Sequence, residues 1–223
     1  MRIVIASRNR GKVREIGQIF AGIGVELVTL DDVPPFPEPE ETGETFLENA
    51  RIKARAAAEA SGLPALADDS GIEVDALGGA PGVRSARYGG PGLDDAGRCA
   101  RLLAALRDVP EAERGANFRC VMVLWPPPGA GWEPLASEGF FYGRIAGRPA
   151  GTNGFGYDPV FFVPEAKRTA AEMTAEEKNA MSHRYRALVE MKHLVIDAFG
   201  LEAGFPEPED SGGGDRIPGG SGR

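Results

Sequence analysis

The N-terminal part of the chain alternates short apolar runs with stretches in which apolar residues recur every three or four positions. Residues 3–6 form a continuous apolar run, which predicts a buried strand, and residues 13–20 carry apolar side chains at helical spacing. Residues 25–30 predict a second strand. After a loop rich in proline and glutamate, residues 45–61 predict a helix that begins with a Thr-x-x-Glu capping box.

The remainder of the chain continues this alternation and adds a hairpin. Further strands are predicted over residues 63–67, 72–77, 118–125, 139–145 and 160–163, and helices over residues 94–107, after Thr174, and from Ser182 to about 199. Two glycine-rich loops, residues 78–92 and 147–159, separate these elements. Strands that first alternate with helices and then form a hairpin predict a mixed α/β sheet flanked by helices.

Composition limits the class of protein. The chain has 223 residues, 42% of them hydrophobic, which is enough for one substantial domain, predicted over residues 1–200. Residues 201–223 are Gly, Pro, Ser and acidic residues with few apolar side chains, so we expect a disordered tail. A net charge of −8 argues against a nucleic-acid partner or an anionic membrane surface. Two cysteines outside any C-x-x-C pair, and no apolar run long enough to cross a bilayer, predict a soluble cytoplasmic protein.

The first candidate for chemistry is the polar segment between the first strand and the first helix. Its residues are Ser7, Arg8, Asn9, Arg10, Gly11 and Lys12. Free backbone N–H groups and the dipole at a helix start favour an anion, and Lys12 adds a positive charge for a phosphate. The segment is not a Walker A loop, because Val13 stands where that loop has Ser or Thr. A solvated turn with a surface lysine fits the same residues.

Adjacent acidic residues provide a candidate metal site. Asp68 and Asp69 are predicted at the end of an apolar strand, where they project to opposite faces, so one of them points into a given site. A carboxylate there suits Mg²⁺, which keeps several waters and shares phosphate oxygens with its ligand. An acidic turn fits equally well. The loop of Glu38, Glu40 and Glu41 supplies a second carboxylate only if it folds back toward Asp69, and Lys53 is expected to face solvent unless it joins that site.

Two later segments carry the remaining candidates. In Gly154-Phe155-Gly156 the glycines leave the ring open for stacking on a base, although an anchor for a tight turn is the commoner role of a loop aromatic. In residues 178–184 a helix break near Ser182 groups donors that suit the 6-oxo group of a purine and reject the 6-amino group of adenine. A helix cap with exposed basic residues is the alternative.

Taken together, these segments resemble the Ham1/RdgB-like family of inosine triphosphate pyrophosphatases, which act on deaminated purine nucleotides. The resemblance covers about residues 2–200 and rests on SRNRGK (7–12), EETGETFLENARIKA (40–54), ALADDSGIEVDALGGAPGVRSARYGG (65–90), FGYDPVFFVPE (155–165) and EKNAMSHR (177–184). It implies a two-lobed fold with a long central sheet, a nucleotide cleft between the lobes, and a homodimer.

The resemblance also implies the reaction and the role of each matching residue. A nucleoside triphosphate such as dITP, ITP or XTP would be cleaved between its α- and β-phosphates with Mg²⁺ as cofactor. Asp69 would bind the metal and activate water, Glu41 would be a further metal ligand, and Ser70 would touch the substrate. The phosphates would be held by Ser7, Arg8, Asn9, Arg10, Gly11 and Lys12, with Lys53 assisting. The base would be held by Phe155, Gly156, Tyr157, Asp158, Lys178, His183 and Arg184.

The sequence leaves three alternatives open. Asp68 and Asp69 are both candidates for the general base, and we favour Asp69. A Maf-like pyrophosphatase for dTTP or UTP is a rival enzyme, against which the Ser-His-Arg segment and the Phe155 loop argue. A nucleotide-binding module without catalysis is a rival of another class, for which two metal carboxylates would be costly features.

Overall fold

The computed structural model describes residues 1–202, so the predicted disordered tail lies almost wholly outside the described residues. The strands are β1 (Arg2–Ile5), β2 (Glu26–Val28), β3 (Ala65–Val74), β4 (Gly115–Trp125), β5 (Leu135–Ile145), β6 (Phe161–Val163) and β7 (Arg168–Thr169). The α-helices are α1 (Arg10–Phe20), α2 (Phe46–Ser61), α3 (Asp95–Ala105), α4 (Ala175–Met181) and α5 (His183–Phe199). None of the described helices is long and apolar enough to span a membrane.

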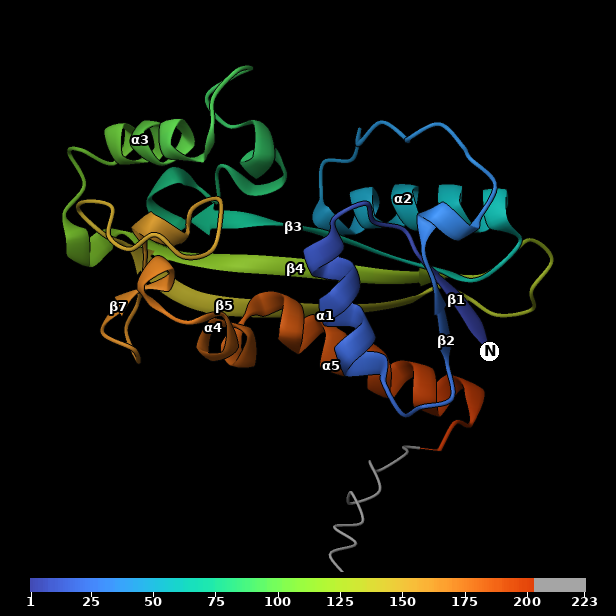
Figure 1. Cartoon of the computed structure of the whole chain (residues 1–223). Coiled ribbons are helices and arrows are strands. Elements are labelled where there is room, and N and C mark those ends of the chain that lie inside the picture. Colours follow the sequence, from blue (N-terminus) through green and yellow to red (C-terminus); the bar gives the residue numbers. More distant parts are fainter. Residues whose placement is uncertain (203–223) are drawn as a thin grey trace, which may run out of the picture.

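One seven-stranded sheet runs through the molecule in the order β2-β1-β3-β4-β5-β6-β7. β1 pairs in parallel with β2 and β3, and every other neighbouring pair is antiparallel. Figure 1 shows α2 on one side of the sheet and α1 and α5 on the other, with α3 near the far end of β3. The mixed α/β sheet predicted from the sequence is therefore confirmed.

The apolar periodicity of the sequence becomes a core on both faces of the sheet. On one face, Ile5 and Leu66 pack with Ile16 of α1 and Leu188 of α5. On the other face, small residues of α2 lie against Val4, which lets that helix approach the strands closely. A third cluster joins α3 and β6 to the far halves of β3, β4 and β5. These clusters lie at the two ends of the long central strands, in agreement with a two-lobed fold.

The main difference from the prediction is at β3. Residues 63–67 and 72–77 were expected as strands with a polar junction, and Asp68 and Asp69 were expected at a strand's end. The two aspartates lie instead in the middle of a single ten-residue strand, β3. The reason is β4, which pairs with β3 without interruption and so provides hydrogen bonds through the polar segment. The parallel neighbour β1, by contrast, reaches only Leu66, and the chain leaves the sheet there toward α1.

Candidate active site

The polar segment after β1 is organised by Asn9, which caps α1. Its side-chain oxygen accepts hydrogen bonds from the backbone N–H groups of Gly11 (2.9 Å) and Lys12 (3.2 Å), and Ser7 Oγ accepts one from the N–H of Asn9 (3.2 Å). The expectation that these N–H groups are free is therefore wrong for Gly11 and Lys12, because Asn is a favoured N-cap residue. An incoming phosphate would compete with Asn9 for them.

The alternation of β3 separates its two acidic residues onto opposite faces, as predicted. Asp68 faces α1 and α5, where it contacts Lys12 and Arg184. Asp69 faces α2, where it contacts Lys53 and Asn49. One strand thus carries two neighbouring carboxylates into different surroundings.

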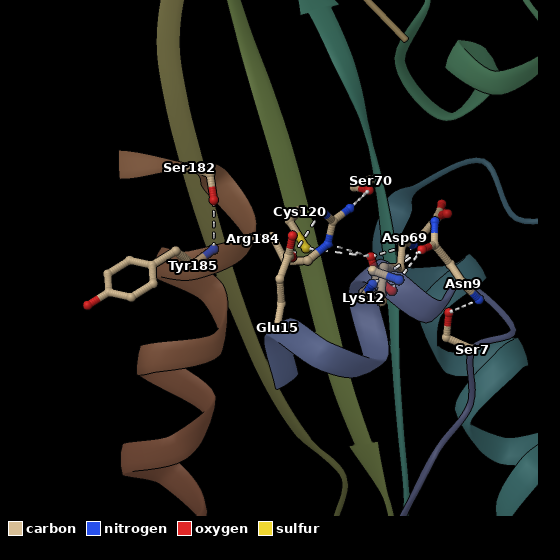
Figure 2. A network of polar contacts seen from close by, with 12 residues as sticks. Ser7, Asn9, Lys12, Glu15, Asp69, Ser70, Cys120, Ser182, Arg184 and Tyr185 are labelled. Atoms are coloured by element: carbon tan, nitrogen blue, oxygen red, sulfur yellow. Dashed lines mark hydrogen bonds and ion pairs between the residues drawn. The ribbon is translucent and has the colours of Figure 1, made fainter. Parts of the chain in front are cut away.

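Asp68 is the centre of a buried ion-pair network. Figure 2 shows its partners Lys12, from α1, and Arg184, from α5, converging from opposite sides. Lys12 Nζ donates to both of its oxygens, at 2.9 and 2.7 Å, and Arg184 Nε lies 3.6 Å from Oδ2. Arg184 also lies near Ser70 Oγ (3.3 Å) and Glu15 (3.5 Å). Burial opposes the charge of Asp68, but Lys12 and Arg184 outweigh it and lower the pKa of this carboxyl. Asp68 therefore connects the first turn of α1 to the start of α5.

Asp69 is part of a second group of charged side chains, which was expected only if the loop of Glu41 folds back toward it. Lys53 Nζ lies 2.9 Å from Asp69 Oδ1 and 2.8 Å from Glu41 Oε1, and Asn49 donates to Asp69 Oδ2 at 3.2 Å. The loop of Glu41 does fold back toward Asp69, and Lys53 does not face solvent. Burial raises the pKa of Asp69 despite the nearby lysine.

The carboxylates of Glu41 and Asp69 have the chemistry of a Mg²⁺ site. Both converge on one cationic centre, the ammonium of Lys53. Within residues 1–202 no three Asp, Glu, His or Cys side chains form a metal-binding group. That is compatible with Mg²⁺, which proteins usually bind through one or two carboxylates while water and substrate phosphates complete its coordination.

A cavity of about 330 Å³ lies where β3 and β4 meet α3, the second glycine loop and the start of α5. Three sequence segments predicted to bind the substrate line it together: Ser70 from β3, Phe155 to Asp158 from the second glycine loop, and Lys178, His183 and Arg184 from α4 and α5. Its other walls come from Gly71, Ile72, Ser85, Ala86, Asp95, Arg98 and Phe118. Lys12 does not line the cavity, but it is linked to it by side-chain contacts, because Asp68 contacts both Lys12 and the lining residue Arg184.

The loop of Phe155 holds an aromatic ring at the cavity with 61% of its surface exposed. Gly154 and Gly156 have φ values of +75° and +62°, a conformation that glycine adopts without strain. The buried carboxylate of Asp158 accepts a hydrogen bond from the N–H of Phe155 (3.0 Å) and forms an ion pair with Lys178. Lys178 Nζ also lies 4.9 Å from the centre of the Phe155 ring. The alternative role for Phe155, a core anchor, is excluded by its exposure.

His183 is buried at the start of α5, with its ring stacked on Phe118 at 5.1 Å. Burial, with Arg184 and Lys178 nearby, holds its pKa well below the usual value, so the ring is neutral at pH 7. Its Nδ1 has no hydrogen-bond partner among the described residues. Ser182 caps α5 by accepting a hydrogen bond from the backbone N–H of Tyr185 (3.1 Å).

The remaining predicted residues and some unpredicted ones complete the site. Arg8, on the loop before α1, and Arg10, the first residue of α1, are both exposed. The ring of Tyr157 is buried, and its hydroxyl donates to the carbonyl of Ser85 at 2.8 Å. Asp95 and Arg98 of α3 also line the cavity, and no motif or spacing in the sequence distinguishes them. Their spacing is ordinary for a helix start, and only the fold places α3 beside the Phe155 loop.

Solved structures place the fold in a known class. The chain superimposes on a HAM1 protein from Coxiella burnetii with a TM-score of 0.81 and 44% identity, covering 88% of this chain and 99% of that chain. A nucleoside-triphosphatase / dITP/XTP pyrophosphatase from Mycobacterium abscessus gives a TM-score of 0.73 and 50% identity, over 86% and 98% of the two chains.

Sequence comparison gives the family. The model of the Ham1 family matches residues 3–194, and the chain belongs to this family. A Geobacter sulfurreducens protein named dITP/XTP pyrophosphatase is 53% identical over 86% of this chain and 96% of its own length. A protein of the same name from Escherichia coli K12 is 48% identical over 88% and 97%. The family resemblance inferred from the five sequence segments is thereby confirmed.

Proposed function

We propose that the protein is a Mg²⁺-dependent pyrophosphatase that hydrolyses dITP, ITP and XTP to the monophosphate and pyrophosphate. The observation that carries the proposal is the cavity in which Phe155, Lys178, His183 and Arg184 meet, connected through Asp68 to Lys12. The names of relatives that are about half identical support the same activity. A homodimer and a cytoplasmic location remain predictions from the sequence.

The base is proposed to enter the cavity against the exposed ring of Phe155. Stacking on an aromatic ring accepts any base, so it does not discriminate among them. Discrimination is assigned to the donors of Lys178 and Arg184 and to the neutral imidazole of His183, whose Nδ1 is unpaired among the described residues. A 6-oxo group accepts hydrogen bonds from such donors. The 6-amino group of adenine does not, and leaves them unpaired.

Phosphoanhydride cleavage needs mainly positioning and neutralisation of charge. Lys12 and Lys53 are proposed to contact the phosphates, and each has a carboxylate partner that it can exchange for a phosphate oxygen. Glu41 and Asp69 would hold Mg²⁺, which supplies further charge neutralisation when bound. A water oxygen attacks the phosphorus, its proton passes to a carboxylate, and pyrophosphate leaves.

The carboxylate that takes this proton is proposed to be Asp69. Against the effect of burial, Lys12 and Arg184 lower the pKa of Asp68, which makes it the weaker base, and its side chain is 4% exposed. Asp69 lies on the other face of β3 beside Glu41's partner Lys53 and is more accessible, at 12%. The role proposed for Asp68 is therefore to position Lys12 and Arg184, and the role proposed for Asp69 is to accept the proton of the attacking water.

The proposal is tested by measuring pyrophosphate release from dITP, XTP, dGTP, dATP and dTTP, with and without Mg²⁺. We expect kcat/KM for dITP and XTP to exceed that for dATP at least about tenfold, which is about 1.4 kcal/mol of transition-state binding. Equal rates on dATP would refute the assigned base discrimination. Faster turnover of dTTP would indicate a Maf-like enzyme, and nucleotide binding without any pyrophosphate release would indicate a binding module.

The role of Asp69 has its own test. Asp69→Asn keeps the shape and the hydrogen bond from Asn49 but removes the proton acceptor and a metal ligand. We expect turnover to fall by at least about a hundredfold, the lower end of what a general base contributes. Circular dichroism should show an unchanged fold. Full activity in this variant would remove Asp69 from the mechanism.

A further inference from the structure

The peptide of Gly156, which directly follows the exposed ring of Phe155, is held from α3. Asp95 Oδ2 accepts a hydrogen bond from the N–H of Gly156 at 2.7 Å, a distance typical of a charge-assisted bond. The thiol of Cys99, one turn further along α3, donates to the carbonyl of the same residue at 3.3 Å. Both polar groups of this residue are therefore bonded to one helix, 57 and 61 residues away in sequence.

The neighbours of this contact keep it in place. Arg98 Nη1 donates to the other oxygen of Asp95 at 3.0 Å. The carboxylate of Asp95 therefore contacts both the guanidinium of Arg98, in the same helix, and the peptide of Gly156. Burial, together with the charges of Asp95 and Asp158, raises the pKa of Cys99 to about 11, and the thiol keeps its proton at neutral pH. Asp95 and Cys99 thus act as an acceptor and a donor that complement the two groups of Gly156.

The loop requires such support because its own conformation is loose. Glycines on both sides of Phe155 allow many backbone conformations, and the ring is too exposed to be fixed by packing. On its N-terminal side the loop is fixed by Asp158, which accepts from the N–H of Phe155. The contacts from α3 provide the corresponding constraint on the C-terminal side. Together they fix the backbone from which the ring projects into the cavity.

We propose that Asp95 is a positioning residue for base recognition, which holds the Gly156 peptide and so presents the Phe155 ring to the base. The role rests on the proposed function, because it assigns a purpose to the orientation of that ring. Asp95 acts through the loop and has no part in bond cleavage. Its loss should weaken binding of the nucleotide in the ground state and in the transition state alike, which raises KM and leaves kcat unchanged.

The chain offers a matched control in Asp94. This neighbour caps α3 by accepting from the N–H of Gly97 at 2.8 Å, so Asp94→Ala weakens the same helix without removing the bond to Gly156. Asp95→Asn keeps a neutral acceptor oxygen and tests rescue, whereas Asp95→Ala removes the acceptor. A defect that came only from an unstable α3 would be at least as large in Asp94→Ala.

Two measurements test the proposal. In the nucleotide-free protein, amide hydrogen exchange at Gly156 should be faster in Asp95→Ala than in Asp94→Ala or the wild type. In steady-state assays with dITP, Asp95→Ala should raise KM about five- to tenfold with kcat within about twofold, the size of effect expected when one ordinary intramolecular hydrogen bond is lost. Asp95→Asn should recover most of the affinity.

The outcomes separate this proposal from the proposed function. Unchanged exchange at Gly156 in Asp95→Ala, an equal KM defect in Asp94→Ala, or a fall in kcat at constant KM would each overturn the positioning role. A wild-type protein that does not hydrolyse dITP would overturn the proposed function and, with it, the purpose assigned to Asp95. The exchange measurement would still decide whether α3 holds the loop.

Discussion

Replacing Asp68 by Asn should destabilise the protein far more than replacing an exposed partner of an ion pair. Asp68 is 4% exposed and carries the only negative charge that contacts Lys12 among the described residues, while Arg184, 7% exposed, has Glu15 at 3.5 Å as a second partner. Breaking a buried ion pair costs about 3–5 kcal/mol, because the remaining charge is left without a partner. Lys12 is 21% exposed and can turn toward water, so we expect the lower value, about 3 kcal/mol.

The matched control is the pair Arg55–Glu59 on α2, whose side chains are 62% and 56% exposed. Exposed pairs of this kind contribute about 0.5 kcal/mol or less, so Glu59→Gln should be nearly neutral. Urea unfolding without nucleotide or Mg²⁺ measures both. At a slope of about 2 kcal/mol per molar, the Asp68→Asn midpoint should fall by about 1.5 M and the Glu59→Gln midpoint by less than about 0.3 M.

The charges of the partner residues provide a further test. If the cost comes from unpaired cations, adding Lys12→Met to Asp68→Asn should recover part of the lost stability. A midpoint shift for Asp68→Asn no larger than that for Glu59→Gln would refute the view that a buried network joins α1 to α5.

Three other predictions follow from the site. Phe155→Ala should raise KM for dITP about tenfold with little change in folding stability, because the exposed ring contributes stacking energy to the base and little to the core; an unchanged KM would contradict this. The pKa of His183 is lowered in the folded protein, so its imidazole is neutral there, whereas in the unfolded chain it binds a proton as pH falls through about 6.5. The free energy of unfolding should therefore decrease below that pH, by up to about 1.4 kcal/mol per pH unit. His183→Gln should flatten this slope in urea unfolding between pH 7.5 and 5.5, and an identical slope would exclude His183 as its source. Removing divalent cations with EDTA should stop pyrophosphate release while the far-ultraviolet circular dichroism stays constant, and activity that persists in EDTA would exclude the Mg²⁺ requirement.

The features predicted correctly from the sequence are those encoded locally. Thr45 and Glu48 form the expected capping box at the start of α2, and α4 begins directly after Thr174, as predicted. Ser182 likewise marks the start of α5, although its hydroxyl faces a backbone N–H and not the cavity. Caps are fixed by side chains within one turn, so a single sequence contains all the information they need.

The features that were missed depend on partners far along the chain. The polar middle of β3 is a strand because β4, about fifty residues later, pairs with it throughout. Lys53 follows ordinary helical spacing, and only the folded loop of Glu41 and the placement of Asp69 give it two carboxylate partners. The contact of Asp95 is equally long-range, since the Gly156 peptide that it binds lies 61 residues away in sequence. Pattern and spacing cannot report such contacts.

The alternation of side chains along β3 has a consequence for how the gene can vary. Deleting or inserting one residue between Leu66 and Asp68 would move every later side chain of the strand to the opposite surface of the sheet. The carboxylate beside Glu41 would then face Arg184, and the partner of Lys12 would face α2. Length changes in this family should therefore be tolerated in the connecting loops, while in β3 a frame-preserving loss of one codon should inactivate the protein as surely as a truncation.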